Sequence, residues 1–168
     1  AGVAPSAPLV KTTDEVWRQT LETNLSGPFY CLREALPAMV EAGWGRVINV
    51  ASIAARTGAP YIAAYAASKH GPLGLTRCAA LEVAARGVTV NAVCPGYVDT
   101  PMVDAGIARI VEKTGISPQE ARRRLEEMSP QKRMYTVQEV SALVRFLCTE
   151  EARGINGQAL TLDGGSVP

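Results

Sequence analysis

Two short apolar runs rich in β-branched residues, at 46–51 and 88–94, stand on either side of a long alanine-rich segment. Each run has the length and composition of a buried strand. Residues 63–81 between them have the composition of a helix. A strand, a helix and a second strand in that order form a right-handed crossover with parallel strands. This arrangement constrains the fold more than any other feature, and it predicts an α/β protein with a parallel sheet.

Three polar side chains stand where such a sheet binds its ligands. Ser52 follows the first predicted strand, at the carboxyl end of the sheet. Tyr65 and Lys69 are four residues apart on the predicted helix, so they lie on one face. A phenol that gives a proton, an ammonium that lowers the phenol's pKa and a hydroxyl that binds a carbonyl oxygen indicate carbonyl chemistry. The simpler alternatives are a capping serine and an ordinary Tyr–Lys pair on a helix.

Further motifs extend this spacing to a known family. The motifs are Ser52 thirteen residues before Tyr65, Tyr65-Ala-Ala-Ser-Lys69, Asn24 in Glu22-Thr-Asn-Leu-Ser-Gly27, and Pro95-Gly-Tyr-Val-Asp-Thr-Pro101. Together they resemble the signature of the short-chain dehydrogenase/reductase family. The resemblance runs in order from Ala1 to about Gly165.

The resemblance implies reversible hydride transfer between a nicotinamide cofactor and a ketone or secondary alcohol. Tyr65 would be the general acid in reduction and the general base in oxidation. Lys69 would bind the nicotinamide ribose and Ser52 the substrate oxygen. Asn24 would connect Lys69 to bulk water through a proton relay. The alternative for Asn24 is that its amide satisfies the helix backbone next to the break predicted at 27–28.

The resemblance also places the cofactor at the end of the second strand. Pro95 and Gly96 end that strand, and Gly96 lets backbone approach a ligand closely. Val98 would offer backbone groups to the carboxamide and Thr100 a hydroxyl. The cofactor would be NAD or NADP, and no metal site is expected.

The predicted elements run helix, strand, helix, strand, helical segment, helix, strand. A helix interrupted at 27–28 covers 13–42, another begins at 136 or 137, and the last strand covers 158–163. This is the second half of a doubly wound, Rossmann-like parallel sheet. No stretch matches the glycine-rich turn of the first half. We therefore expect residues 1–168 to form one domain, the C-terminal part of a longer protein.

Residues 100–128 contain local helical signals at 107–113 and 118–127 but little core pattern. A segment of this kind above a strand end is a candidate substrate lid. The alternative is a helical insertion on the surface.

Within the family, the stretch from 95 to 165 is most similar to 3-hydroxybutyrate dehydrogenases, 3-oxoacyl-thioester reductases and polyketide ketoreductases. The first group holds a free carboxylate with a histidine and a lysine, where this chain has Ala54 and Ile62, and its tryptophan is matched by Tyr97. These apolar residues leave no cation for a small free acid, so they predict a 3-oxoacyl thioester or a bulkier ketone as substrate. A 3-hydroxybutyrate-type dehydrogenase, a non-catalytic scaffold and a fragment without cofactor binding are the alternatives.

Composition excludes several other classes. Seventeen basic and sixteen acidic residues give a net charge of +1. This small charge lacks the basic excess that is typical of nucleic-acid-binding proteins. The Arg122–Arg124 run lies between glutamates and predicts a solvated helix face. No run reaches the ~20 apolar residues of a membrane span. We expect a cytoplasmic protein with four buried, unpaired thiols. These are Cys31, Cys78, Cys94 and Cys148.

The helix that carries Tyr65 is apolar nearly all round, so it should be covered on two sides. The sheet covers one side, and a second subunit is expected on the other. Family members pair through this helix and the preceding one, which implies a homodimer or homotetramer. The single histidine, His70, is interpreted as a packing or interface residue.

Overall fold

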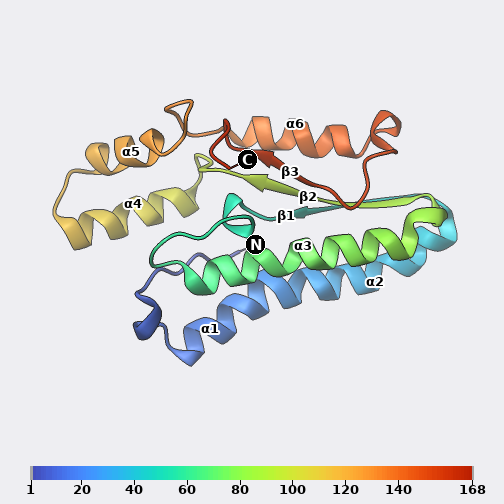
Figure 1. Ribbon diagram of the computed structural model, residues 1–168, viewed down its shortest axis with the longest axis horizontal. Coiled ribbons are helices and arrows are strands. Elements are labelled where there is room, and N and C mark those ends of the chain that lie inside the picture. Colours follow the sequence, from blue (N-terminus) through green and yellow to red (C-terminus); the bar gives the residue numbers. More distant parts are fainter. Residues whose placement is uncertain (1, 168) are drawn as a thin grey trace.

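A parallel sheet of three strands runs through the middle of the computed structural model, which describes residues 2–167 (Figure 1). Strands β1 (Gly45–Val50), β2 (Val88–Pro95) and β3 (Ala159–Leu162) lie side by side in that order. Gly45 pairs with Val88, and Ala92 with Ala159. The predicted α/β fold with parallel strands is confirmed, and the strand ends differ from the prediction by one residue.

The central strand β2 is buried along its whole length. Its sequence, Val-Thr-Val-Asn-Ala-Val-Cys-Pro, is mostly apolar and small, as expected for a strand covered on both faces. Helices α2 (Gly27–Ala42) and α3 (Ala63–Val83) cover one face of the sheet, and α6 (Val137–Leu147) covers the other (Figure 1). The main apolar cluster fills the space between α2, α3 and the sheet. It comprises Leu32, Ala79, Ala80, Val83, Val88 and Val90.

Residues 14–42 form one continuous helical run, as predicted, but its irregularity lies at 22–26 and not at 27–28. Helix α1 (Asp14–Leu21) is capped by Thr13, whose side chain accepts a hydrogen bond from Val16 N. A π-helical turn at Glu22–Ser26 then joins α1 to α2. The irregularity predicted at 27–28 is therefore a widened turn that ends just before it. Gly27 and Pro28 are the first residues of α2 and follow this turn directly, so the break in the regular hydrogen-bond pattern lies next to the residue that has no N–H to donate.

Helices α4 (Pro101–Thr114) and α5 (Pro118–Glu127) project beyond the carboxyl ends of the strands (Figure 1). We call residues 100–128 the α4–α5 segment. It has its own small apolar cluster, separate from the main core. Helix α4 starts six residues earlier than predicted because Pro101 occupies its first turn. Helix α5 has the predicted bounds, and Ser117 caps it by accepting from Glu120 N at 3.1 Å.

Helix α6 begins with a capping box, in which Thr136 and Glu139 each bond the other's backbone N–H. Four short 3-10 turns connect the elements among residues 2–167. They lie at Leu9–Lys11, Ile53–Ala55, Ala84–Arg86 and Glu150–Ala152. Within the same residues, every helix is too short or too polar to cross a lipid bilayer.

Candidate active site

The carboxyl ends of β1 and β2 lie next to each other, and the candidate residues gather there. Ser52 lies two residues past the end of β1. Its Oγ accepts a hydrogen bond from Ala54 N at 3.1 Å and so caps the 3-10 turn Ile53–Ala55. The capping role is therefore present in the structure. The hydroxyl proton remains available for a second partner.

The first two turns of α3 bring Tyr65 and Lys69 to the same place. Lys69 Nζ lies 5.9 Å from the centroid of the Tyr65 ring. It donates a hydrogen bond to Val50 O at 3.0 Å. The Ser52 hydroxyl lies near enough to the Tyr65 phenol to lower its pKa. The end of β1 and the start of α3 thus hold the hydroxyl, the phenol and the ammonium together.

Burial governs the protonation of these groups. Desolvation raises the pKa of the Tyr65 phenol above its ordinary value, and the nearby Ser52 hydroxyl opposes this more weakly. Desolvation lowers the pKa of the Lys69 ammonium, and the neighbouring Cys94 opposes that change. The sequence predicted that Lys69 lowers the phenol's pKa. In the protein without cofactor, burial dominates and the pKa of the phenol is raised. Its lowering by Lys69 together with an oxidised nicotinamide stays a prediction.

Asn24 lies in the π-helical turn, and its amide is committed to two partners. Its Oδ1 accepts from Val3 N at 3.0 Å. Its Nδ2 donates to Val3 O at 2.8 Å and to Ser68 Oγ at 3.0 Å. The amide therefore joins the N-terminal loop to α3. It makes no hydrogen bond with Lys69, the residue to which the resemblance linked it. A π-turn of this kind is common at functional sites.

The loop after β2 carries the residues expected at the cofactor. Gly96 N donates to Leu162 O at 2.9 Å, and a side chain at Gly96 would meet Tyr135 at 3.0 Å. Thr100 Oγ1 donates to Val98 O at 3.1 Å. Val98 and Tyr135 form an isolated parallel bridge, which we call the neck. The neck closes the base of the α4–α5 segment beside the site.

Comparison with known proteins decides which family this arrangement belongs to. Residues 1–166 match the family model described as enoyl-(acyl carrier protein) reductase. The chain belongs to the short-chain dehydrogenase/reductase family.

Several short-chain dehydrogenases/reductases are similar to this chain. D-beta-hydroxybutyrate dehydrogenase from Rhizobium meliloti is 41% identical over 90% of this chain and 59% of its own length. A putative ketoacyl reductase from Streptomyces coelicolor is 38% identical over 98% of this chain and 64% of its own length. The solved structure of an actinorhodin polyketide ketoreductase with NADPH is 38% identical, with a TM-score of 0.94 over 99% of this chain and 64% of that one. The chain spans less than two thirds of the length of each.

Ser68 is a residue of this short-chain dehydrogenase/reductase that sequence reasoning missed. Its side chain is fully buried. Its Oγ donates to Tyr65 O at 2.7 Å and accepts from Asn24. The available signal was its position, a single hydroxyl among alanines three residues after Tyr65. Its partner Asn24 is 44 residues away in sequence, and no local pattern indicates that contact.

The prediction of four buried cysteines is wrong for this short-chain dehydrogenase/reductase. Only Cys94 is buried among the four, and all four are free thiols. Cys31 and Cys78 lie on helices α2 and α3 in apolar sequence, but the helical rotation turns both toward the outside. Cys148 lies at the exposed end of α6. Among residues 2–167, no three His, Cys, Asp or Glu side chains form a group that could hold a metal ion.

Proposed function

We propose that the natural protein is an NAD(P)-dependent oxidoreductase. It transfers a hydride reversibly between nicotinamide and a ketone or secondary alcohol. The observation that carries the proposal is the meeting of Ser52, Tyr65 and Lys69 at the carboxyl end of β1. A buried phenol next to a hydroxyl and an ammonium can deliver a proton to a carbonyl oxygen, and open α/β sheets bind ligands at this edge.

Tyr65 is the general acid when a ketone is reduced and the general base when an alcohol is oxidised. Burial keeps its phenol protonated in the free protein, which suits proton donation. Ser52 holds the substrate oxygen beside the phenol. Lys69 attracts the developing phenolate by its charge. Asn24 orients the first turns of α3 through Ser68, because it bonds that hydroxyl and Ser68 in turn bonds Tyr65 O.

The residues present fit a nicotinamide nucleotide. The Lys69 ammonium has three donors, and Val50 O takes one, so others are available for ribose hydroxyls. The loop from Pro95 to Thr100 offers backbone groups where Gly96 packs tightly against Tyr135. When bound, the nicotinamide supplies the hydride and, in its oxidised form, a positive charge beside the phenol. The proposal covers either NAD or NADP.

The proposed substrate is a 3-oxoacyl thioester or a similar ketone. Ala54 is buried next to Ser52, and Ile62 precedes the helix of Tyr65, so neither position offers a cation to a free carboxylate. A buried carboxylate without a cationic partner is costly. The ketoacyl reductases among the relatives agree with this choice. The alternative is a hydroxybutyrate-type dehydrogenase, which the 41% identity to D-beta-hydroxybutyrate dehydrogenase favours.

We propose that the α4–α5 segment is the substrate lid. Tyr97 links the α4–α5 segment to the candidate site. Its ring packs against the apolar cluster of that segment. Burial raises the pKa of its phenol, and the nearby Tyr65 raises it further. The ring of Tyr97 therefore packs against the proposed lid and lies near the proposed proton donor. A substrate held there would contact both.

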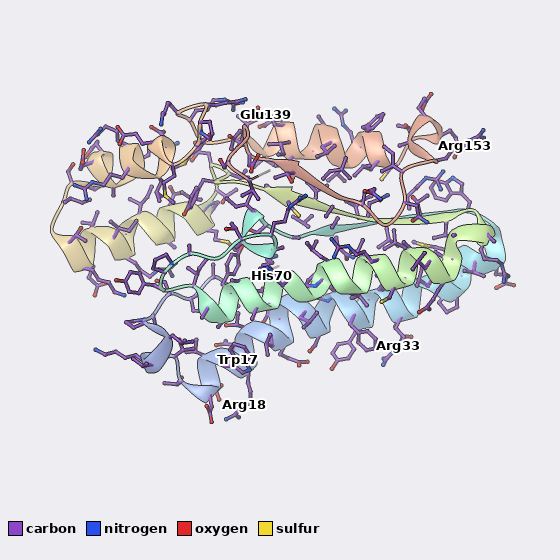
Figure 2. The ribbon with its side chains drawn as sticks, in the orientation of Figure 1. Trp17, Arg18, Arg33, His70, Glu139 and Arg153 are labelled. Carbon is purple, nitrogen blue, oxygen red and sulfur yellow. The ribbon has the colours of Figure 1, made fainter. Side chains whose placement is uncertain are left out.

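We propose assembly as a homodimer or homotetramer through α2 and α3. Phe29 and Tyr30 are partly exposed on α2, and Leu81 is 81% exposed on α3. Arg33 points outward from α2 over both aromatic rings, at 5.5 Å from each centroid (Figure 2). Leu73 is buried in the core, so only the outer face of α3 is open for a partner. Unpaired cysteines agree with the reducing cytoplasm as the compartment.

A steady-state assay on the natural gene product tests the proposed reaction. NADH and NADPH are offered in turn with a 3-oxoacyl thioester, a cyclic ketone and acetoacetate. The thioester or the cyclic ketone should be reduced with a far higher kcat/KM than acetoacetate. Equal kcat/KM values would remove the substrate argument and favour the hydroxybutyrate alternative. No oxidation of either cofactor with any ketone would contradict the reaction itself.

A further inference from the structure

A pair of hydrogen bonds fastens the loop after β2 to helix α5. Arg122 Nη1 and Nη2 donate to Asp99 Oδ1 and Oδ2 at 3.1 Å and 2.7 Å. Arg122 Nε donates to Glu126 Oε1 at 3.2 Å, which orients the guanidinium from within the helix. A bidentate arginine–carboxylate pair fixes both partners in one plane and is more directional than a single bond. This contact therefore sets the position of Asp99 relative to α5.

The other arginines of the run behave differently. Arg123 pairs with Glu120 and Glu127, and Arg124 pairs with Glu120. These pairs stay inside α5 and match the solvated helix face predicted from the sequence. Arg122 alone in the run reaches another element, among the ion pairs of residues 2–167. The contact is therefore specific to one position of three consecutive arginines.

Asp99 stands between the two residues proposed to bind the nicotinamide end, Val98 and Thr100. On its other side, Asp99 N donates to Tyr135 O at 2.9 Å, and Tyr135 N donates to Tyr97 O at 2.8 Å. The backbone from 97 to 100 is thus held by the neck on one side and by Arg122 on the other. Removing Arg122 would leave the neck and the bonds that Thr100 makes with Val98 and with the first turn of α4.

We propose that Asp99 and Arg122 are positioning residues that hold the Val98–Thr100 backbone in the shape that binds the cofactor. This inference rests on the proposed function, because it concerns the same cofactor site. Docking of α5 and binding of the cofactor then favour each other, since a coupling between two sites is reciprocal. Neither residue touches the reacting atoms.

The matched variants Arg122→Gln and Arg123→Gln in the natural gene product test the pair. Both remove one guanidinium from α5, but only the first breaks a contact with Asp99. For Arg122→Gln we expect the Kd and KM for NAD(P)H to rise roughly three- to tenfold, with kcat changed by less than about twofold. For Arg123→Gln both constants should equal the wild-type values. A wild-type Kd and KM for Arg122→Gln would overturn the proposal.

Asp99→Asn is the second variant, because it keeps the shape of the side chain and removes its charge. If the two residues act as a unit, Asp99→Asn and the double variant Asp99→Asn/Arg122→Gln lose as much cofactor affinity as Arg122→Gln alone. If the losses of cofactor affinity in the two single variants instead add up in the double variant, the two residues act independently and the proposal that they work as a pair is overturned. A general weakening of the fold would lower the thermal midpoint in parallel with affinity, whereas a positioning role lowers affinity at an unchanged midpoint.

Amide hydrogen exchange of the cofactor-free protein separates this inference from the proposed function. Arg122→Gln should speed exchange in peptides that cover 97–103, and Arg123→Gln should not. Unchanged exchange for Arg122→Gln would overturn the positioning role whatever the cofactor data. Failure of the wild-type protein to bind NAD(P)H would instead contradict the proposed function, and with it the cofactor part of this inference.

Discussion

The sheet with α3 and the α4–α5 segment hold their polar side chains in opposite ways. Beside the sheet, several buried polar side chains bond backbone groups. Asn91 is fully buried, donates to Ile155 O at 2.7 Å and accepts from Gln158 N at 3.0 Å. On α5, exposed side chains bond one another, as Arg123 does with Glu120 at 2.9 Å. The α4–α5 segment has an apolar cluster of its own, so the two regions differ in their polar contacts, which are interior beside the sheet and exposed on α5.

The difference separates what must stay fixed from what can adjust. A buried polar group that loses its partner costs about 1–3 kcal/mol, so the sheet side tolerates little rearrangement. Exposed ion pairs contribute about 0–1 kcal/mol each and weaken in salt. The proposed acid–base residues stand on the first kind of support. The ion pairs on the face of α5 are of the second kind, so they can rearrange without disturbing those residues.

The replacement Tyr65→Phe should have the largest effect of all, and it falls on the rigid side. It keeps the buried ring and removes the proton carrier, so kcat should fall by about 10²–10⁴ while the fold is retained. Steady-state rates with NAD(P)H and the preferred ketone measure this. Tyr30→Phe, on the exposed face of α2, is the control and should turn over normally. Near-normal turnover of Tyr65→Phe across the pH range would refute the proton-transfer role.

The second-largest effect should be a difference in folding stability between a variant beside the sheet and one on α5. Asn91→Ala leaves Ile155 O and Gln158 N without their partner, so the free energy of unfolding should fall by about 2–4 kcal/mol. Arg123→Gln should change it by less than about 0.5 kcal/mol. Urea denaturation of both variants gives the two values. Equal losses would mean that the surface of α5 supports the fold as strongly as the interior does.

Salt should then distinguish the two regions in the unmodified protein. Raising NaCl from 0.15 M to 1 M shortens the Debye length from about 8 Å to about 3 Å. Amides of α5 should exchange faster by a few fold, and amides of β2 should not change. Hydrogen exchange resolved by peptide measures both regions in one sample. If salt changed the exchange of α5 and β2 amides equally, the claimed difference between the two regions would be wrong.

The smallest expected effect lies where the two regions join, at the start of α6. Bonds from Arg133 and then from Thr136 hold the pKa of Glu139 well below its ordinary value of 4.5, at about 2. A carboxyl with a lowered folded pKa stabilises the protein above the unfolded pKa, and this contribution is lost as the pH falls through about 2. Glu139→Gln should lower the thermal midpoint slightly at pH 7, with a difference that shrinks between pH 4.5 and 2.5. A constant difference would show that its charge is not involved.

The sequence predicts the arrangement around Ser52, Tyr65 and Lys69 well because the spacing involved is local. A strand end and two residues four apart on one helix determine it. The ends of α5 follow in the same way from Ser117 and Pro118, which cap and begin that helix. Local rules of this kind need no knowledge of the rest of the chain.

Long-range partners escape such rules. Asn24 bonds Val3 and Ser68, which are 21 and 44 residues away. Arg122 reaches Asp99 across 23 residues, although its two neighbours follow the helix-face pattern. The rotation of α2 and α3 about their axes turns Cys31 and Cys78 outward, and apolar sequence neighbours did not reveal it. The rise in the pKa of Tyr65 likewise depends on burial by the whole fold.

The neck between Val98 and Tyr135 has a consequence for how such a protein can evolve. It brings the start and end of a long excursion together outside the sheet. Doubling the length of a closed loop costs only about 0.6 kcal/mol in chain entropy. The stretch beyond the neck can therefore be lengthened, shortened or exchanged for another while β2 and β3 keep their register. Selection for a new substrate could then change this one stretch and leave the proposed proton-transfer residues unaltered.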